Sequence, residues 1–126
     1  MIVGIGTDLI EIERVRKACQ KQAFYTRCFS VREQELIKEN MSKAAGNWAV
    51  KESIGKCFGT GISGFQLNEI EVLRDKKGKP YVELYGSAQN LCAQLEIDTI
   101  HVSITNTEDY AIAYVIAERN RDYASS

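Results

Sequence analysis

Apolar residues near the start of the chain follow two different periods. Residues 2–5 form a short apolar run that predicts a buried strand, in which two glycines permit close approach of another backbone. Asp8 and Glu11 then have the spacing of a helix-entry capping box, and apolar residues at 12, 15 and 19 continue at helical intervals. We therefore expect a helix over about residues 9–22, with Asp8 at the junction between strand and helix.

A second helical region leads into a cluster of glycines. Ser30 followed by Glu33 gives another helix-entry signal, and apolar residues at helical spacing continue as far as Gly59. Among them, residues 50, 54, 57 and 58 share one face. Glycines at 59, 61 and 64 predict that the helix ends there and a loop begins, because glycine adopts the left-handed backbone that closes a helix.

The second half of the chain has the patterns of strands. Apolar residues at 70–72 and 81–84 predict two strands joined by a polar turn, with Pro80 at the start of the returning strand. Residues 87–96 predict a short helix, and residues 99–105 and 110–118 predict two further strands. The sequence thus predicts an α+β domain over residues 1–118. Its helices are concentrated in the first half and an antiparallel sheet in the second, followed by a polar, frayed tail at 119–126.

Composition and charge bound the class of protein but not its activity. A chain of 126 residues with 44% hydrophobic and 26% charged residues is typical of one globular domain. Its formal charge of −1 gives no overall signature of binding to nucleic acid or to an acidic membrane surface. The start has no signal-peptide pattern or membrane span, and the cysteines lack metal-type spacing. We expect a cytoplasmic protein with reduced thiols, no zinc site and no membrane insertion.

The segment WAVKESIGKCFGTG, residues 48–61, holds the first candidates for chemistry. Glu52 and Lys56 are four residues apart in the order that favours an ordinary surface ion pair, and spacing alone favours that interpretation. Their position just before a glycine loop also suits a site in which a carboxylate binds Mg²⁺ and a lysine binds phosphate. Asp8 would be the second carboxylate, although its own pattern favours a helix cap. The glycine segments match neither the dinucleotide fingerprint nor the P-loop.

Four segments together resemble one family. MIVGIGTDLIEIERV, WAVKESIGKCFGTGI, GKPYVEL and HVSITNTEDYAIAYVIAE are similar, in order and spacing, to the holo-[acyl-carrier-protein] synthases, the small 4'-phosphopantetheinyl transferases. The resemblance covers nearly the whole chain, and the early GxD combined with WAxKExxxKxxGTG is specific. It implies an antiparallel sheet packed with helices, and a homotrimer with sites between neighbouring subunits.

The resemblance also implies a reaction. Phosphopantetheine would pass from coenzyme A to a serine of apo-acyl carrier protein in a Mg²⁺-dependent step that releases adenosine 3',5'-bisphosphate and supports fatty acid biosynthesis. Asp8 and Glu52 match the metal-binding acids, and we expect Glu52 and Lys56 to act in catalysis. Besides Lys56, the residues expected to contact coenzyme A are Gly59, Thr60, Gly61, Lys79, Pro80, Ser103, Thr105, Asn106 and Thr107.

Two positions depart from the family pattern. The family usually has an arginine where Asn47 stands and often a histidine where Asn106 stands, and both are associated with the 3'-phosphate of coenzyme A. The loss of two cations predicts weak discrimination between coenzyme A and its dephosphorylated form, unless Lys43 or another basic residue compensates.

Basic residues along the expected first helix form a candidate partner surface. Arg14, Lys17 and Lys21 repeat at intervals of three and four. Such a stripe is usually only a solvated face. The resemblance nevertheless implies a partner, because this family binds acidic acyl carrier proteins through its first helix, where complementary charge would speed encounter and fix orientation.

Two other classes of function stay open. A non-catalytic nucleotide or carrier-protein binding module would explain the two asparagines, but not the presence of Asp8, Glu52 and Lys56 together. A nucleic-acid-binding domain is disfavoured because the net charge is −1 and no aromatic platform accompanies the basic stripe. His101, the sole histidine, stays outside the catalytic set, because a histidine in a row of threonines and serines more often makes a cross-strand hydrogen bond.

Overall fold

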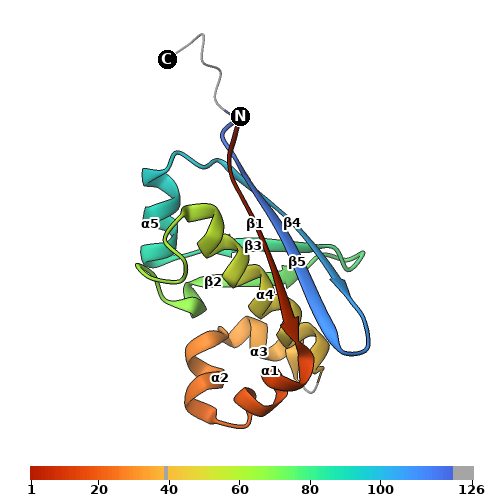
Figure 1. Ribbon diagram of the computed structural model, residues 1–126. Coiled ribbons are helices and arrows are strands. Elements are labelled where there is room, and N and C mark those ends of the chain that lie inside the picture. The colour runs from red at the N-terminus through yellow and green to blue at the C-terminus, as the bar shows by residue number, and fades with distance from the viewer. Residues whose placement is uncertain (39, 121–126) are drawn as a thin grey trace.

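The computed structural model describes residues 1–38 and 40–120 (Figure 1). Three strands, β1 (Ile2–Glu11), β4 (Thr99–Asn106) and β5 (Tyr110–Glu118), form one antiparallel sheet in the order β1-β5-β4. The antiparallel hairpin of β2 (Ile70–Arg74) and β3 (Pro80–Leu84) crosses the direction of these long strands. The first and last strands of the chain are therefore neighbours, and β5 is the hydrogen-bonded partner of β1 in the described sheet.

The central element is α4 (Met41–Phe58), which lies against the three-stranded sheet. Three shorter helices surround its N-terminal half in Figure 1: α1 (Ile12–Cys19), α2 (Gln22–Cys28) and α3 (Val31–Ile37). The 3-10 turn η1 (Leu67–Glu69) precedes β2, and α5 (Gly86–Gln94) packs into the core beside the C-terminal half of α4.

Two apolar cores hold α4 in place. One lies between α4 and the sheet and includes Val50, Ile54 and Val115; the other lies under α1–α3 and includes Phe29 and Ile37. Each of these side chains is at most 1% exposed, and each such burial contributes roughly 1.5–3 kcal/mol. The helix is therefore enclosed from both sides, and few of its side chains reach solvent.

Two glycines bring the backbone of β1 into contact with α4. A Cβ atom on Gly4 would overlap the carbonyl oxygen of Cys57, and a Cβ atom on Gly6 would overlap that of Ser53. Cys57 and Ser53 are one helical turn apart, and the glycines are adjacent on one face of the strand. The close approach predicted from the glycines is confirmed, and the next residue on that face is Asp8.

The helix predicted over residues 9–22 is wrong in its first part and in its continuity. β1 continues through Asp8 to Glu11, α1 begins at Ile12, and Glu11 makes no side-chain capping bond. The pairing of β1 with β5 explains the difference, because residues of β1 as far as Glu11 have partners on β5. The predicted helix also breaks after Cys19, and α2 begins at Gln22.

The prediction that the first strand is buried is also wrong for this chain. Ile5 and Leu9 are 66% and 57% exposed, because they point away from α4 on the open face of β1. The apolar pattern predicted the strand correctly. It did not predict that these side chains would be exposed in the single chain.

The remaining elements are confirmed with changed boundaries. Ser30 and Glu33 form a reciprocal capping box on α3, and α4 ends at Phe58, followed by Gly59 as its C-cap with φ +77°. The second helical region is two helices, because α3 ends at Ile37 and α4 begins at Met41. The strands predicted in the second half are present, with Pro80 opening β3.

The predicted tail at 119–126 is described only at its first two residues. Asn120 donates from its backbone amide to Oδ2 of Asp98 at 2.8 Å, and residues 121–126 lie outside the described residues. The domain boundary at 118 therefore stays a prediction. Among the helices of the described ranges, none is long and apolar enough to cross a lipid bilayer.

Candidate active site

The accessible side of α4 is a single narrow stripe. Between residues 44 and 58 every residue is buried except Trp48, Glu52 and Lys56. These three are spaced by four, so they lie one above another on the helix. Glu52 and Lys56 therefore occupy the exposed stripe of a helix that is otherwise enclosed, not an ordinary surface helix.

The structure brings Asp8 to this stripe. The Lys56 ammonium donates to the Thr7 carbonyl oxygen at 2.7 Å and lies 3.3 Å from Oδ1 of Asp8. Lys56 thus binds β1, whereas the simple surface interpretation paired it with Glu52. That interpretation is wrong in this structure, and the three residues that the sequence grouped together do form one cluster.

The charges around Glu52 include both other members of this group, Asp8 and Lys56. Burial raises the pKa of Glu52, the Asp8 carboxylate raises it further, and the Lys56 ammonium opposes both effects. A second carboxylate close enough to raise the pKa of Glu52, with only one lysine beside the pair, favours an additional cation at this site. Carboxylate oxygens are ligands that Mg²⁺ prefers, and Mg²⁺ commonly takes only one or two of them from protein. Asp8 and Glu52 could supply such a pair of ligands. Among the described residues there is no group of three or more His, Cys, Asp or Glu side chains placed for a metal ion.

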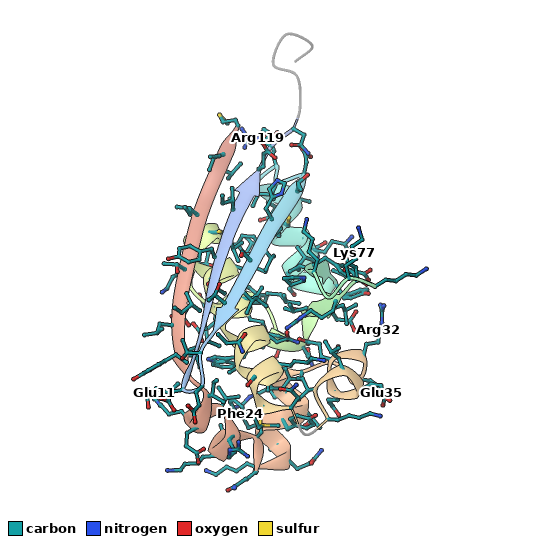
Figure 2. The ribbon with its side chains drawn as sticks, turned by 90° about the vertical axis from the view of Figure 1, so that its right-hand side faces the viewer. Glu11, Phe24, Arg32, Glu35, Lys77 and Arg119 are labelled. Carbon is teal, nitrogen blue, oxygen red and sulfur yellow. The ribbon has the colours of Figure 1, made fainter. Side chains whose placement is uncertain are left out.

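A pocket of about 440 Å³ opens beside Glu52. Its lining includes Arg14 of α1, Tyr110 of β5, and the rings of Phe24 and Trp48, whose centroids are 5.5 Å apart. Figure 2 labels Phe24 below the end of β1, at the edge of the helical layer. Glu52 therefore lines a pocket that also contains two aromatic rings and one arginine.

A second hollow adjoins the first on the outer side of α1 and α2. Lys17, Lys21 and Arg27 line it around the same Phe24 ring. Lys21 is not on the first helix, because α1 ends at Cys19, so the single predicted stripe is divided between α1 and the start of α2. The cations nevertheless continue from Arg14, beside Glu52, onto the outer surface of these helices.

The glycine loop follows directly after the stripe. The Gly61 amide donates to the Gly55 carbonyl oxygen at 3.0 Å, and Thr60 Oγ1 lies 3.1 Å from the Gly61 carbonyl oxygen. Residues 59–61 are exposed. The loop is thus anchored on the last turns of α4 near Lys56, as the sequence predicts, and its outer surface is open.

The other predicted coenzyme A residues lie along the opposite edge of the sheet. Ser103, Thr105 and Asn106 are on β4, which β5 separates from β1. Thr107 closes the turn by accepting from the Tyr110 amide at 3.0 Å, and Lys79 and Pro80 begin the return of the β2–β3 hairpin. Within one chain, these residues are not brought together with Asp8, Glu52 and Lys56.

A polar pocket of about 270 Å³ lies at this second edge. We call it the Arg74 pocket; its lining residues are Asn40, Ser42, Lys43, Arg74, Gly78, Pro80, Ile104 and Asn106. Arg74 is absent from the sequence-based set of site residues. Its place as the first residue of the turn segment RDKKGKP was the only signal, and the facing residues of α4 come from a distant part of the chain.

Asn47 does not lie in either pocket. Its side chain is fully buried and donates to Oε2 of Glu33 at 3.0 Å and to the Val72 carbonyl oxygen at 2.9 Å. Asn47 therefore serves as a hydrogen-bond donor in the core of this chain. The weak discrimination between coenzyme A and its dephosphorylated form stays a prediction.

Lys51, next to Glu52 in sequence, is also fully buried. Its ammonium lies 2.7 Å from Oε1 of Glu33 and donates to the backbone carbonyl oxygens of Cys28, Leu67 and Ile70. Because all of these partners are acceptors, Lys51 is protonated and Glu33 is its counter-ion. Helical spacing places Lys51 seven residues from both Ala44 and Phe58, which are buried, and this signal could have identified it as internal.

His101 lies outside both groups. Its Nε2 is 2.9 Å from Oε1 of Glu118 on the neighbouring strand β5. The cross-strand contact predicted from the sequence is confirmed.

Comparison with known proteins supports one family throughout. The model of the 4'-phosphopantetheinyl transferase superfamily matches residues 4–115. The holo-[acyl-carrier-protein] synthase of Lachnoclostridium phytofermentans is 53% identical over 97% of this chain and 100% of its own length. Among solved structures, the enzyme of that name from Neisseria meningitidis superposes with a TM-score of 0.86 at 28% identity, over 94% of this chain and 100% of the other.

A further solved structure shows a ligand. The holo-(acyl-carrier-protein) synthase from Bacillus anthracis, in complex with CoA (3',5'-ADP), is 32% identical and superposes with a TM-score of 0.79, over 95% of this chain and 99% of that one. Sequence, fold and the Asp8–Glu52–Lys56 cluster agree, and this chain belongs to the holo-[acyl-carrier-protein] synthases of the 4'-phosphopantetheinyl transferase superfamily.

Proposed function

We propose that this protein transfers 4'-phosphopantetheine from coenzyme A to a serine hydroxyl of apo-acyl carrier protein. The serine oxygen forms a bond to the phosphorus that carries the pantetheine group. The bond from this phosphorus to the bridging oxygen breaks, and adenosine 3',5'-bisphosphate leaves. The reaction is Mg²⁺-dependent and serves fatty acid biosynthesis in the cytoplasm.

One observation carries the proposal: the accessible stripe of α4 meets Asp8 of β1. An enclosed helix exposes a carboxylate and a lysine at one place, and two glycines bring a second carboxylate there. A site for binding alone has no need of a second acid that raises the pKa of Glu52.

The acidic and basic residues of the site would have different roles in the reaction. Asp8 and Glu52 would hold Mg²⁺, which when bound would neutralise phosphate oxygens and orient them. Lys56 is 52% exposed and donates to groups that a phosphate oxygen could replace, so it would stabilise charge on the leaving or transferred phosphate. Glu52, or a water molecule, would accept the serine proton. The raised pKa of Glu52 favours Glu52 in that role.

Coenzyme A requires more surface than one chain offers at this site. The glycine loop lies beside Lys56, whereas Lys79, Pro80 and the end of β4 lie across the sheet. We propose a homotrimer in which β1 of one subunit faces the Arg74 pocket edge of the next. The open face of β1 and β5 suits burial between subunits, since Ile5 and Leu9 of β1 and Tyr114 of β5 are each more than half exposed.

The basic hollow beside the active site suits an acidic protein partner. Arg14 lines the pocket that contains Glu52, and Lys17 and Lys21 continue the positive charge outward. A carrier protein that binds there would present its serine directly to the acid. These side chains surround an aromatic ring, so contact would combine charge with apolar burial.

The test is the intact mass of the carrier protein. Apo-acyl carrier protein is incubated with coenzyme A, Mg²⁺ and this protein, and a parallel sample contains EDTA. We expect a mass gain of one phosphopantetheine only in the sample with free Mg²⁺, and no detectable gain over the same time with the Glu52→Gln variant. No gain with folded wild-type protein, or an equal gain in EDTA, would contradict the proposal.

A further inference from the structure

The pocket beside Glu52 has walls made of helices and strands. Its lining residues, in the part of the chain that the structure describes, belong to β1, α1, α2, α4 and β5. The glycine loop at residues 59–61 is not among them. Closure around a substrate is usually the motion of a loop or a domain. The described walls of this pocket therefore contain no loop that could close when a carrier protein binds.

The charged groups of the site are held by contacts within one chain. Glu52 is fixed because α4 is enclosed on both sides, and Gly6 of β1 closely approaches the helix backbone at Ser53, the next residue. The Lys56 ammonium lies 3.3 Å from Oδ1 of Asp8. Closure around a second substrate is one way in which enzymes assemble catalytic groups and keep water out. Here the acids and the lysine are brought together by the fold, so the carrier protein is needed only for its hydroxyl group.

Water fits the position of that hydroxyl group. The pocket has a volume of about 440 Å³, and a water molecule occupies roughly 30 Å³ and needs about two to four polar partners. The polar side chains of the lining include Glu11, Arg14, Glu52 and Tyr110. Water and serine are also alike as nucleophiles, since each is a neutral hydroxyl compound that must lose a proton as it attacks phosphorus.

We propose that this protein also hydrolyses coenzyme A when the pocket beside Glu52 holds water instead of a carrier protein. The water oxygen forms a bond to the phosphorus that carries the pantetheine group, and one of its protons passes to Glu52. The bond from this phosphorus to the bridging oxygen breaks, and the bridging oxygen keeps the electron pair. The products are 4'-phosphopantetheine and adenosine 3',5'-bisphosphate. The inference rests on the proposed function, which makes coenzyme A the donor and Glu52 a part of the reacting site.

The first test follows the oxygen atom of water. Protein, coenzyme A and Mg²⁺ are incubated in H₂¹⁸O without carrier protein, and the products are analysed by mass spectrometry. We expect one labelled oxygen in 4'-phosphopantetheine and none in adenosine 3',5'-bisphosphate, because the attack is at the phosphorus that carries pantetheine. Label in the bisphosphate, or no release of 4'-phosphopantetheine above that from coenzyme A without protein, would overturn the inference.

Two glutamine variants test whether the active site performs this hydrolysis. Glu52→Gln should lower the rate of 4'-phosphopantetheine release by about 10²-fold or more, as expected for the loss of a general base. Glu35→Gln is the matched control and should keep the wild-type rate. Glu35 of α3 is exposed, and Figure 2 shows it on the opposite side of the helical layer from Glu11. Equal rates for Glu52→Gln and wild type would assign the hydrolysis to another site and overturn the inference.

A carrier protein that cannot react tests whether water uses the acceptor position. In this carrier protein the acceptor serine is replaced by alanine, and its Kd is measured by calorimetry. At a concentration about ten times the Kd it leaves about a tenth of the sites open, so hydrolysis should fall about tenfold. An unchanged rate at saturation would show that the water does not use the acceptor position, and this too would overturn the inference.

The proposed function and this inference can fail separately. A mass gain of apo-acyl carrier protein, with no hydrolysis of coenzyme A in its absence, supports the proposed function and overturns this inference. Release of labelled 4'-phosphopantetheine with no mass gain of the carrier protein contradicts the proposed function. In that case the isotope label and the Glu52→Gln variant still decide the hydrolysis.

Discussion

Two lysines on α4, five residues apart, belong to opposite kinds of charged cluster. Lys51 is completely buried, with Glu33 and three carbonyl oxygens around its ammonium. Lys56 is 52% exposed and contacts one carbonyl oxygen and Asp8. The Lys51 ammonium has acceptors for all of its N–H groups, whereas the exposed Lys56 ammonium has room for another charged partner. Residue type does not separate a structural charge from a functional one, but the number of partners and the access of solvent do.

The two clusters also differ in what they join. Lys51 connects α4 to the end of α2, to α3, to η1 and to β2, so it joins the helical layer to the hairpin. Lys56 connects α4 to β1 alone. A change at Lys51 should therefore affect the whole fold, and a change at Lys56 should affect the site.

The largest expected effect is on stability, from Lys51→Met. This change leaves Glu33 buried without its counter-ion, and breaking a buried pair in this way costs about 3–5 kcal/mol. Urea unfolding measures the loss. The same substitution at Lys56 is the matched control and should cost less than about 1 kcal/mol, because that ion pair is exposed. Equal losses of unfolding free energy for Lys51→Met and Lys56→Met would contradict the distinction between the buried and the exposed charged cluster.

The next effect is on catalysis, from Glu52→Gln. We expect turnover to fall on the order of 10³-fold, since the variant would lose the proposed metal ligand and base. Stability should not fall. The pKa of Glu52 is higher in the folded protein than in the unfolded chain, so its ionisation above that pKa opposes folding, and glutamine removes this cost. Thermal unfolding at neutral pH checks the expected unchanged stability of Glu52→Gln. A marked drop in Tm would show that Glu52 has a structural role.

A smaller catalytic effect, with a distinct pH signature, is expected from Lys56→Met. Removal of one cation from the phosphate site should lower kcat/KM about 10²-fold. Lys56 lowers the pKa of Glu52, so its loss should raise that pKa further. If ionised Glu52 is needed, activity is lost as pH falls through this pKa, and the acid limb of the rate profile should move to higher pH. An unmoved limb would show that Glu52 does not control it.

The smallest effect is expected from Asn47→Ala. The variant loses donors to Glu33 and to the Val72 carbonyl oxygen, which should cost about 1–2 kcal/mol in urea unfolding. The KM for coenzyme A should not change, because Asn47 is in the core and lines neither pocket. A raised KM for coenzyme A with unchanged stability would show that Asn47 contributes to coenzyme A binding.

Local sequence rules predicted elements that depend on local interactions. The Ser30–Glu33 capping box and the glycine stop of α4 are each settled within a few residues. Asp8 and Glu11 satisfied the same capping rule, yet they lie in a strand, because pairing with β5 outweighs it. The signal for that pairing is about a hundred residues away in the chain, beyond any local pattern.

The site was predictable to the extent that its residues share α4. Glu52 and Lys56 have a fixed relation on one helix, and the family pattern supplied Asp8. Arg74 and the buried roles of Asn47 and Lys51 were not found, because they depend on how β2 and α3 pack against the helix. Tertiary packing, not composition, decides which of several neighbouring polar residues reach solvent.

The pairing of β1 with β5 has a consequence for synthesis. β1, which carries Asp8, takes its hydrogen-bonded neighbour from the strand Tyr110–Glu118. At about 5–20 residues per second, the ribosome needs roughly 5–20 s after it has made Asp8 to reach that strand. The cluster of Asp8, Glu52 and Lys56 is therefore not fixed in place until β5 has been made, and a translation product that stops before Tyr110 should be inactive however much of α4 it contains.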